Sequence, residues 1–306
     1  MSLRDATSFA TPPLPSGPPY ACRELGAWAG LAFDLPAGDP RLAALHAGGA
    51  EPTAPLANLA GAAVAWAEWP EHMDFLAADS PMYEQKRAER ALYLRRWEAH
   101  VPPGCRVLDL GGGIGRFTTW CLDRGCDVEL VDPDLRSLHA AVRHAAGRAG
   151  RLDVHWSTGE HLPAIAPVDV VIAAEVLCYV EDPARVLEGV RRLLRPGGPL
   201  LMSVEGRWGW AAAYDASAGT LEALLGDGIV HVPGDKWVHT YDEPDLRALL
   251  AGWTIEELEP THYIPCGAFE SAAGTLSVEE IVAWEARLRA HPTTRPWNRA
   301  WMVRAR

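Results

Sequence analysis

The residues best suited to chemistry form a glycine loop directly after an apolar, strand-like run. The segment Val107–Phe117 reads Val-Leu-Asp-Leu-Gly-Gly-Gly-Ile-Gly-Arg-Phe, with Asp109 in the strand and glycines at alternate positions, Gly111, Gly113 and Gly115. Because glycine has no Cβ, such a loop can turn sharply and let a ligand come close to the backbone. The helix expected next would present unpaired N–H groups and a positive dipole end. The loop is therefore a candidate cradle for a small polar ligand.

A second acid gives this loop its specificity. Asp132 ends the next strand pattern, Val128–Val131, and lies 19 residues after Gly113. An acid at this place can accept hydrogen bonds from both hydroxyls of an adenosine ribose. The competing interpretation, a nicotinamide or flavin dinucleotide site, requires a third glycine where this chain has Arg116. A pyrophosphate also has little use for Asp109, whereas an ammonium group matches that carboxylate.

With these residues the chain resembles the class I S-adenosylmethionine-dependent methyltransferases, over roughly residues 83–259. The run 158–163, Thr-Gly-Glu-His-Leu-Pro, is similar to the family's adenine-contacting segment, with Thr158 where an Asp is common. The run 170–183 resembles the fourth strand and active-site edge, and 195–198, Arg-Pro-Gly-Gly, resembles the turn before the fifth strand. The resemblance implies S-adenosylmethionine as cofactor, and we expect it to be bound by Asp109, Gly111, Gly113, Gly115, Asp132, Gly159, Glu160, Glu175 and Tyr83.

Hydrophobic periodicity predicts the elements that must position these residues. Strands are expected at 106–110, 128–131, 153–155, 168–173, 200–204, 253–258 and around 300–303. Helices are expected at about 80–100, 115–122, 135–147, 183–194, 244–250 and 278–289. Strands that alternate with helices imply parallel pairing and right-handed crossovers. The fold class is thus α/β, a doubly wound Rossmann-like sheet that in this family has seven strands.

Three regions are expected along the chain. Residues 1–79 read as a flexible, proline-rich arm followed by an alanine-rich helical cap. Residues 80–259 form the cofactor-binding core, interrupted by a lid insertion at 205–241, and residues 260–306 hold an insertion helix and a final strand. Insertions after the carboxyl ends of strands lie over the ligand crevice of doubly wound sheets. Both insertions are therefore candidate lids.

The reaction implied by the resemblance is an in-line displacement on a sulfonium methyl group, for which alignment of the acceptor is the main requirement. A protein base is needed only where the acceptor would otherwise stay protonated. The candidate catalytic residues are Glu175 and Tyr179 after the fourth strand, with His239 and then His231 in the lid. Packing or loop roles remain the alternative for each of them. The insertion supplies a mixed aromatic, acidic and basic set: Glu205, Trp208, Trp210, Tyr214, Asp215, His231, Lys236, Trp237, His239 and Tyr241.

Composition and charge limit the partners. A net charge of −12 speaks against a nucleic-acid acceptor and is compatible with a cationic small molecule. No run of about 18 apolar residues indicates a membrane span, and no signal peptide is recognisable, so a cytoplasmic location is expected. Carboxylate and cysteine sets with metal-ligand spacing are missing, so no metal is predicted. The sequence leaves the oligomeric state open.

The expected acceptor is a small molecule held in an enclosed pocket. The leading interpretation is methylation of an amine or hydroxyl of a natural product, with an aminoglycoside-type amine as the specific guess. A composition rich in alanine, arginine, glycine and proline leads us to expect antibiotic biosynthesis or other secondary metabolism. Two alternatives stay open: a phenolic O-methyltransferase, and a catalytically inert methyltransferase fold that serves as a binding module.

Overall fold

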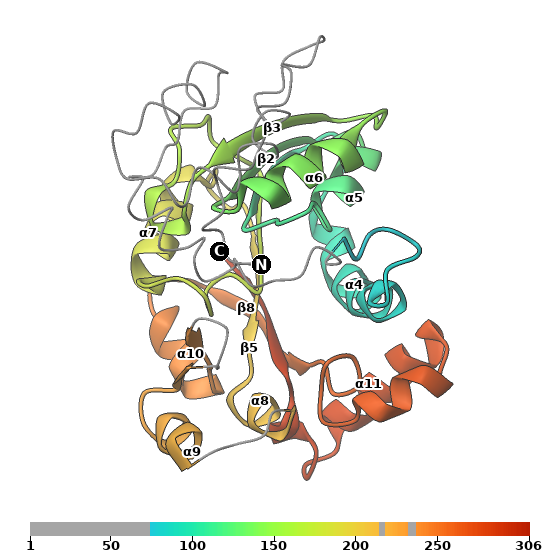
Figure 1. Ribbon diagram of the computed structural model, residues 1–306. Coiled ribbons are helices and arrows are strands. Elements are labelled where there is room, and N and C mark those ends of the chain that lie inside the picture. Colours follow the sequence, from blue (N-terminus) through green and yellow to red (C-terminus); the bar gives the residue numbers. More distant parts are fainter. Residues whose placement is uncertain (1–73, 214–217, 232–236) are drawn as a thin grey trace, which may run out of the picture. The chain divides into compact units, whose positions relative to one another are not determined.

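The computed structural model describes residues 74–213, 218–231 and 237–306 (Figure 1). The arm and helical cap expected at 1–79 lie, apart from 74–79, outside the described residues. Contacts divide the chain into two compact units. Among the described residues, the first unit comprises 102–172 and 185–196, and the second comprises 75–101, 173–184 and 197–306.

The first unit carries parallel strands connected by helices. Its elements are β1 (Arg106–Leu110), α5 (Thr118–Asp123), β2 (Asp127–Asp132), α6 (Leu135–Ala145), β3 (Arg151–Trp156), the 3-10 turn η4 (Gly159–His161), most of β4 (Val170–Ala174) and most of α7 (Pro183–Leu193). β1 pairs in parallel with both β2 and β4, and β2 pairs in parallel with β3. The central strands β1 and β4 are largely buried because a parallel sheet is covered on both faces, whereas β3, at the edge of the sheet, is buried only at Leu152 and Trp156.

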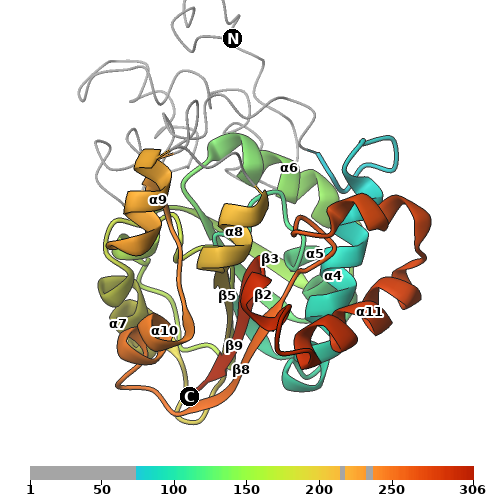
Figure 2. The ribbon, with the colours of Figure 1, turned by 90° about the horizontal axis from the view of Figure 1, so that it is seen from below.

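The second unit contains the remaining strands and both insertions (Figure 2). Its elements are α4 (Tyr83–Trp97), η3 (Glu98–His100), β5 (Leu200–Glu205), α8 (Arg207–Ala213), α9 (Ala218–Leu225), β6 (Ile229–His231), β7 (Trp237–His239), α10 (Glu243–Leu249), β8 (Ile255–Thr261), η5 (Glu270–Thr275), α11 (Val278–Ala290), η6 (Arg295–Trp297) and β9 (Ala300–Ala305). Capping boxes begin α10 at Asp242 and α11 at Ser277. The predicted helix 278–289 is confirmed by α11, which packs against α4.

The strand order of the seven-stranded sheet is β3-β2-β1-β4-β5-β9-β8, which confirms the predicted Rossmann-like methyltransferase sheet. Parallel pairing throughout was the expectation, and the last strand departs from it. β9 pairs antiparallel with both β5 and β8. After β8 the chain passes through α11 and η6 and returns as β9, which lies between β5 and β8 in the sheet. The sheet is therefore mixed.

Two predicted helix starts are also corrected. The helix expected from Gly115 begins at Thr118, because Gly115 has a φ of 93°, a value incompatible with a right-handed helix. The helix expected from about residue 80 begins at Tyr83, and its capping position is Met82 rather than Ser80. The Ser80 hydroxyl instead accepts the Met82 N–H at 3.3 Å, one turn ahead of the helix. No helix among the described residues is long and apolar enough to cross a membrane.

Candidate functional site

The glycine loop in the first unit has the backbone conformation that only glycine adopts easily. Gly111, Gly113 and Gly115 have φ angles of 62°, 54° and 93°. A Cβ built on Gly113 would meet no atom of the described residues within 4 Å, so with respect to this part of the chain the residue borders open space. The carboxylate of Asp132 accepts the Gly113 N–H at 2.9 Å and the Asp134 N–H at 2.8 Å. The predicted ribose acid thus also fixes the shape of the loop.

Asp109 lies beneath this loop, 1% exposed. The Thr118 hydroxyl donates to its Oδ2 at 2.6 Å. Burial raises the pKa of Asp109 to about 6, and hydrogen bonds from Thr118 oppose the shift by stabilising the ionised form. Because burial disfavours the ionised carboxylate, a positive charge beside Asp109 would stabilise it, which agrees with the expected pairing to an ammonium group.

Sequence analysis did not single out Gly112. A Cβ at this position would lie 2.4 Å from Leu130 and 2.6 Å from the Asp109 carboxyl group. Real Cβ atoms do not approach so closely, so Gly112 is required for packing, whereas its neighbour Gly113 faces open space. Two adjacent glycines of one motif therefore have different functions, and nothing in the sequence separates them.

The adenine-type segment follows β3 in the same unit. Trp156, the last residue of β3, is the register partner of Asp132. The chain then forms η4, which contains the predicted Gly159 and Glu160. The Thr158 hydroxyl lies 3.0 Å from His161 Nδ1, and this contact closes the short turn. Glu160 and Asp132 thus belong to segments that leave neighbouring parallel strands at the same end.

The predicted active-site edge begins where β4 ends. Ile172 is the register partner of Asp109, and Glu175 follows it by three residues. Glu175 has a φ of 60°, a strained value for a side chain of this size. Its backbone N–H donates at 3.0 Å to both the Oγ and the carbonyl oxygen of Ser203. The buried Tyr93 hydroxyl donates to Glu175 Oε1 at 2.7 Å. This network holds Glu175 in one conformation.

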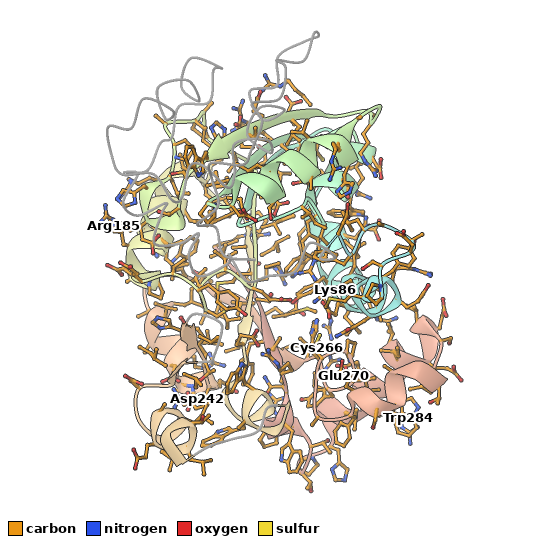
Figure 3. All side chains as sticks on the ribbon, viewed as in Figure 1. Lys86, Arg185, Asp242, Cys266, Glu270 and Trp284 are labelled. Atoms are coloured by element: carbon orange, nitrogen blue, oxygen red, sulfur yellow. The ribbon has the colours of Figure 1, made fainter. Side chains whose placement is uncertain are left out.

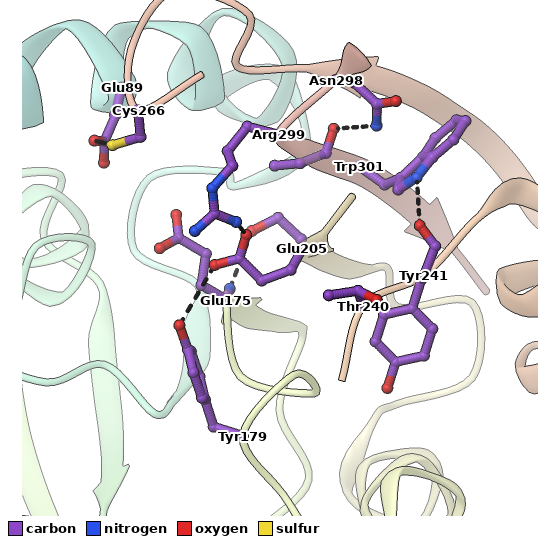
Figure 4. A network of polar contacts seen from close by, with 12 residues as sticks. Glu89, Glu175, Tyr179, Glu205, Thr240, Tyr241, Cys266, Asn298, Arg299 and Trp301 are labelled. Atoms are coloured by element: carbon purple, nitrogen blue, oxygen red, sulfur yellow. Dashed lines mark hydrogen bonds and ion pairs between the residues drawn. The ribbon is translucent and has the colours of Figure 1, made fainter. Parts of the chain in front are cut away.

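Tyr179 belongs to a chain of charged and polar contacts within the second unit (Figure 4). Its hydroxyl donates to Glu205 Oε1 at 3.4 Å, and Glu205 forms an ion pair with Arg299. Burial lowers the pKa of Arg299, and the nearby Tyr179 and Glu175 counteract this shift. Arg299 was not predicted as a site residue, because it is distant in sequence and belongs to no recognisable motif.

The lid insertion folds into helices and a small hairpin rather than a loop. Trp210 is buried with Cys178, Leu224, Val230 and Val238. Tyr241 is 8% exposed and donates its hydroxyl to the Leu177 carbonyl at 2.9 Å, whereas Trp208 is 42% exposed. Among the described aromatic residues of the lid, Trp210 and Tyr241 therefore pack into a local core, and Trp208 stays more exposed. Tyr214, Asp215 and Lys236 lie outside the described residues, as do the side chains of His231 and Trp237.

His239 is the described lid histidine and ends β7. Its N–H donates to the Cys178 carbonyl at 2.8 Å, which ties it to the segment that follows β4. Its ring stacks near Tyr241, with centroids 6.4 Å apart. Burial lowers the pKa of His239, and Asp227 opposes that shift. The imidazole is therefore neutral near pH 7 and able to accept a proton.

No contact among the described residues links Tyr83 to the other predicted site residues. It begins α4, and its ring lies 5.7 Å from the guanidinium of Arg87 on the same helix. The structure thus links Asp132 to Gly113 in the first unit, and in the second it brings Glu175, Tyr179 and Glu205 close to Arg299. Glu89 and His262, which were not predicted, lie close to Glu175.

The known proteins to which this chain is similar are methyltransferases. A model of a methyltransferase domain matches residues 108–200. An uncharacterized methyltransferase of Mycobacterium tuberculosis is 42% identical over 99 residues, which cover 31% of this chain and only 37% of the relative. A ubiquinone biosynthesis O-methyltransferase of Psychrobacter arcticus is 29% identical over 213 residues, which cover 65% of this chain and 73% of the relative.

Among solved structures, an S-adenosylmethionine-dependent methyltransferase from Mesorhizobium loti shares the fold. Its TM-score is 0.52 at 22% sequence identity, and the alignment covers 72% of this chain and 99% of that chain. The matched domain begins in β1 and ends in β5, so it contains the whole glycine loop and Asp132. Residues 108–200 thus form a methyltransferase domain, and the sheet order and loop geometry of the chain are consistent with a class I S-adenosylmethionine-dependent methyltransferase.

Proposed function

We propose that this chain is an enzyme that transfers the methyl group of S-adenosylmethionine to the hydroxyl group of a small aromatic molecule. One observation carries the cofactor assignment. Asp132 holds the Gly113 N–H, and the face of Gly113 where a side chain would project is open. A ligand can therefore contact the loop backbone, and the Asp132 carboxylate can accept hydrogen bonds from the hydroxyls of a ribose. When bound, the cofactor supplies an already activated methyl group.

The described carboxylates support a neutral acceptor over a cationic one. Glu175, Glu205 and Asp215 are the acids near the candidate active-site edge and in the lid that could attract an ammonium group. Glu205 is ion-paired with Arg299, and Glu175 accepts a hydrogen bond from Tyr93. Asp215 lies outside the described residues. An ion-paired carboxylate such as Glu205 gives little net attraction to a polycation, whereas the neutral Tyr93 donor does not cancel the charge of Glu175. The similarity to the ubiquinone biosynthesis O-methyltransferase of Psychrobacter arcticus agrees with a hydroxyl acceptor.

We assign proton removal to His239. A phenol is a weak nucleophile until it begins to lose its proton, so a base near neutral pH is useful. Burial keeps the His239 imidazole neutral, and its backbone bond to Cys178 holds it near the segment that contains Tyr179. Tyr179, whose hydroxyl donates to Glu205, fits better as a group that orients the acceptor than as a base.

A cationic amine, of the aminoglycoside type, is the second candidate. The partly exposed Glu175 supports it, since a carboxylate at the end of β4 would attract an ammonium group. The overall charge of −12 acts in the same direction. A place in antibiotic biosynthesis or secondary metabolism would accompany either acceptor and is part of this proposal.

An acceptor panel separates these possibilities. The full chain is incubated with S-adenosylmethionine and either phenols and catechols or amino sugars, and mass spectrometry follows S-adenosylhomocysteine and methylated product. We expect product only from hydroxyl-bearing aromatic compounds, with the Gly113→Val variant as the blank. Product only from amino sugars would establish the second candidate. A chain that does not bind S-adenosylhomocysteine at all would be an inert scaffold.

A further inference from the structure

Three metal-ligating side chains converge in the second unit from distant parts of the sequence. Glu89 comes from α4, Glu175 follows β4, and His262 follows β8. One ligand atom from each lies within 4.8 Å of the others. This spacing is close to what three ligands around one ion require, since bonds of about 2.0–2.2 Å place ligand atoms roughly 3–4 Å apart.

The three residues differ in exposure in a way that suits a binding site. Glu89 is 0% and His262 2% exposed, whereas Glu175 is only partly buried. Burying two carboxylates beside each other is costly unless positive charge compensates them. The exposed side at Glu175 leaves a path by which an ion can enter and a position for an additional ligand.

The surrounding residues hold these ligands in place. Tyr93 donates to Glu175 at 2.7 Å, and its ring lies 4.9 Å from the His262 ring. His262 has a φ of 59°, and its carbonyl accepts the Arg299 N–H at 3.1 Å. The Glu285 carboxylate from α11 accepts the next two N–H groups, those of Tyr263 at 2.7 Å and Ile264 at 2.8 Å. Such outer contacts orient metal ligands in proteins.

Two further side chains, those of Cys266 and Lys86, contact Glu89; both are labelled in Figure 3, and Figure 4 shows Cys266 beside Glu89. The Cys266 thiol donates to Glu89 Oε1 at 2.6 Å. The Lys86 ammonium lies 2.8 and 3.0 Å from the two Glu89 oxygens and compensates their charge without an ion. A metal ion would have to displace this flexible side chain from at least one oxygen.

We propose that Glu89, Glu175 and His262 form a binding site for a divalent transition-metal ion. Two carboxylates and an imidazole suit Mn²⁺ or Zn²⁺ better than Mg²⁺ or Ca²⁺, which prefer oxygen ligands alone. The site departs from the expectation that the chain binds no metal, because its ligands are 86 and 87 residues apart and show no motif. It goes beyond the proposed methyl transfer and does not depend on it.

The experiment is a titration of the full chain with Mn²⁺, in which electron paramagnetic resonance measures the free ion, without cofactor or acceptor. Glu89→Gln and His262→Asn each remove a ligand, and we expect each to weaken Mn²⁺ binding at least about tenfold. Lys86→Met removes the competing ammonium and should tighten binding about tenfold. His155→Asn is the matched control, since it alters a histidine–carboxylate pair, with Glu129, in the first unit.

Thermal unfolding, measured in the presence of a chelator, shows which variants remain folded. Loss of Mn²⁺ binding can then be distinguished from loss of the fold. If Glu89→Gln unfolds, His262→Asn and Lys86→Met carry the comparison. If the wild-type chain binds no Mn²⁺ even when the ion is present at millimolar concentration, the proposal is wrong. Equal affinity in wild type and His262→Asn would also overturn it, as would a Lys86→Met variant that binds no better than wild type. Because no methyl transfer is measured, these outcomes are independent of the proposed enzyme activity.

Discussion

The carboxylate of Asp132 accepts the backbone N–H of Gly113 at 2.9 Å, so the end of β2 is tied to the middle of the loop that follows β1. The two motif residues, 19 apart in sequence, therefore act as one structural feature. A side chain assigned to ribose binding also sets the loop conformation. A change at Asp132 should consequently affect both the hydroxyl contacts and the loop.

Asp132→Ala should weaken S-adenosylhomocysteine binding. Each lost hydrogen bond to a charged group costs about 1.5–3 kcal/mol, so the dissociation constant should rise by at least roughly tenfold to 150-fold. Isothermal titration calorimetry measures the change. Asp134→Ala is the matched control, because this side chain accepts from Ser137 and only its backbone contacts Asp132. Equal affinities of wild type and Asp132→Ala would exclude Asp132 from the site.

Gly112→Ala and Gly113→Ala should separate packing from binding. The Cβ at Gly112 would collide with Leu130 and Asp109, and overpacking of this kind costs typically about 1–3 kcal/mol. At Gly113 the Cβ meets nothing, but it projects into the ligand's space from a residue with a φ of 54°. Denaturant unfolding should therefore show the larger loss for Gly112→Ala. Cofactor titration should show a clear loss for Gly113→Ala, and retention of full affinity there would mean that the loop does not contact the ligand.

The buried Asp109 should make stability depend on pH. Its folded pKa is about 6, above the ordinary value of 3.8, so the native state binds the proton more tightly than the unfolded chain. The associated stability is present below about pH 4 and is lost as the pH rises through about 6, by roughly 3 kcal/mol. The difference in unfolding free energy between wild type and Asp109→Asn, measured from pH 4.5 to 7.5, isolates this residue. A difference that stays constant over that range would contradict the assignment.

Salt and pH should distinguish the acceptor classes. For a neutral hydroxyl acceptor, the Michaelis constant should change little with salt, whereas attraction of a polycation is screened within about 8–10 Å at ordinary ionic strength. The maximal rate should rise with pH through the His239 pKa, which burial places below its ordinary value, and level off near neutrality.

His239→Asn should lower the maximal rate about 100-fold or more and leave S-adenosylhomocysteine affinity unchanged. Tyr241→Phe is a control within the same cluster, since its hydroxyl is occupied by the Leu177 carbonyl. A rate in His239→Asn that equals the wild-type rate would remove His239 as the base.

Much of the core was predictable because its signals are local. The expected strand 106–110 matches β1, and the expected helices 183–194 and 278–289 match α7 and α11 to within a residue. Alternating apolar runs and the glycines at the ends of helices and strands are set by residues close together in the sequence, so they can be recognised in one sequence alone. The glycine loop and Asp132 were found for the same reason, since their spacing is fixed by one strand–helix–strand unit.

The acceptor side could not be predicted because it is built from long-range contacts. The ion pair of Glu205 with Arg299 joins residues 94 apart, and β9 lies antiparallel between strands that precede it. Trp210 belongs to the candidate lid, and the partners that bury it, Cys178 and Leu224 among them, are set by the tertiary fold. Aromatic composition alone does not distinguish a ligand pocket from a local core.

The central claim, that the Gly113–Asp132 loop binds S-adenosylmethionine, is tested most directly by calorimetric titration of the full chain with S-adenosylhomocysteine and, separately, with NAD. We predict binding of one S-adenosylhomocysteine per chain and no binding of NAD, since Arg116 replaces the glycine that a dinucleotide fingerprint requires. Binding of NAD, or the absence of any heat with S-adenosylhomocysteine, would contradict the account.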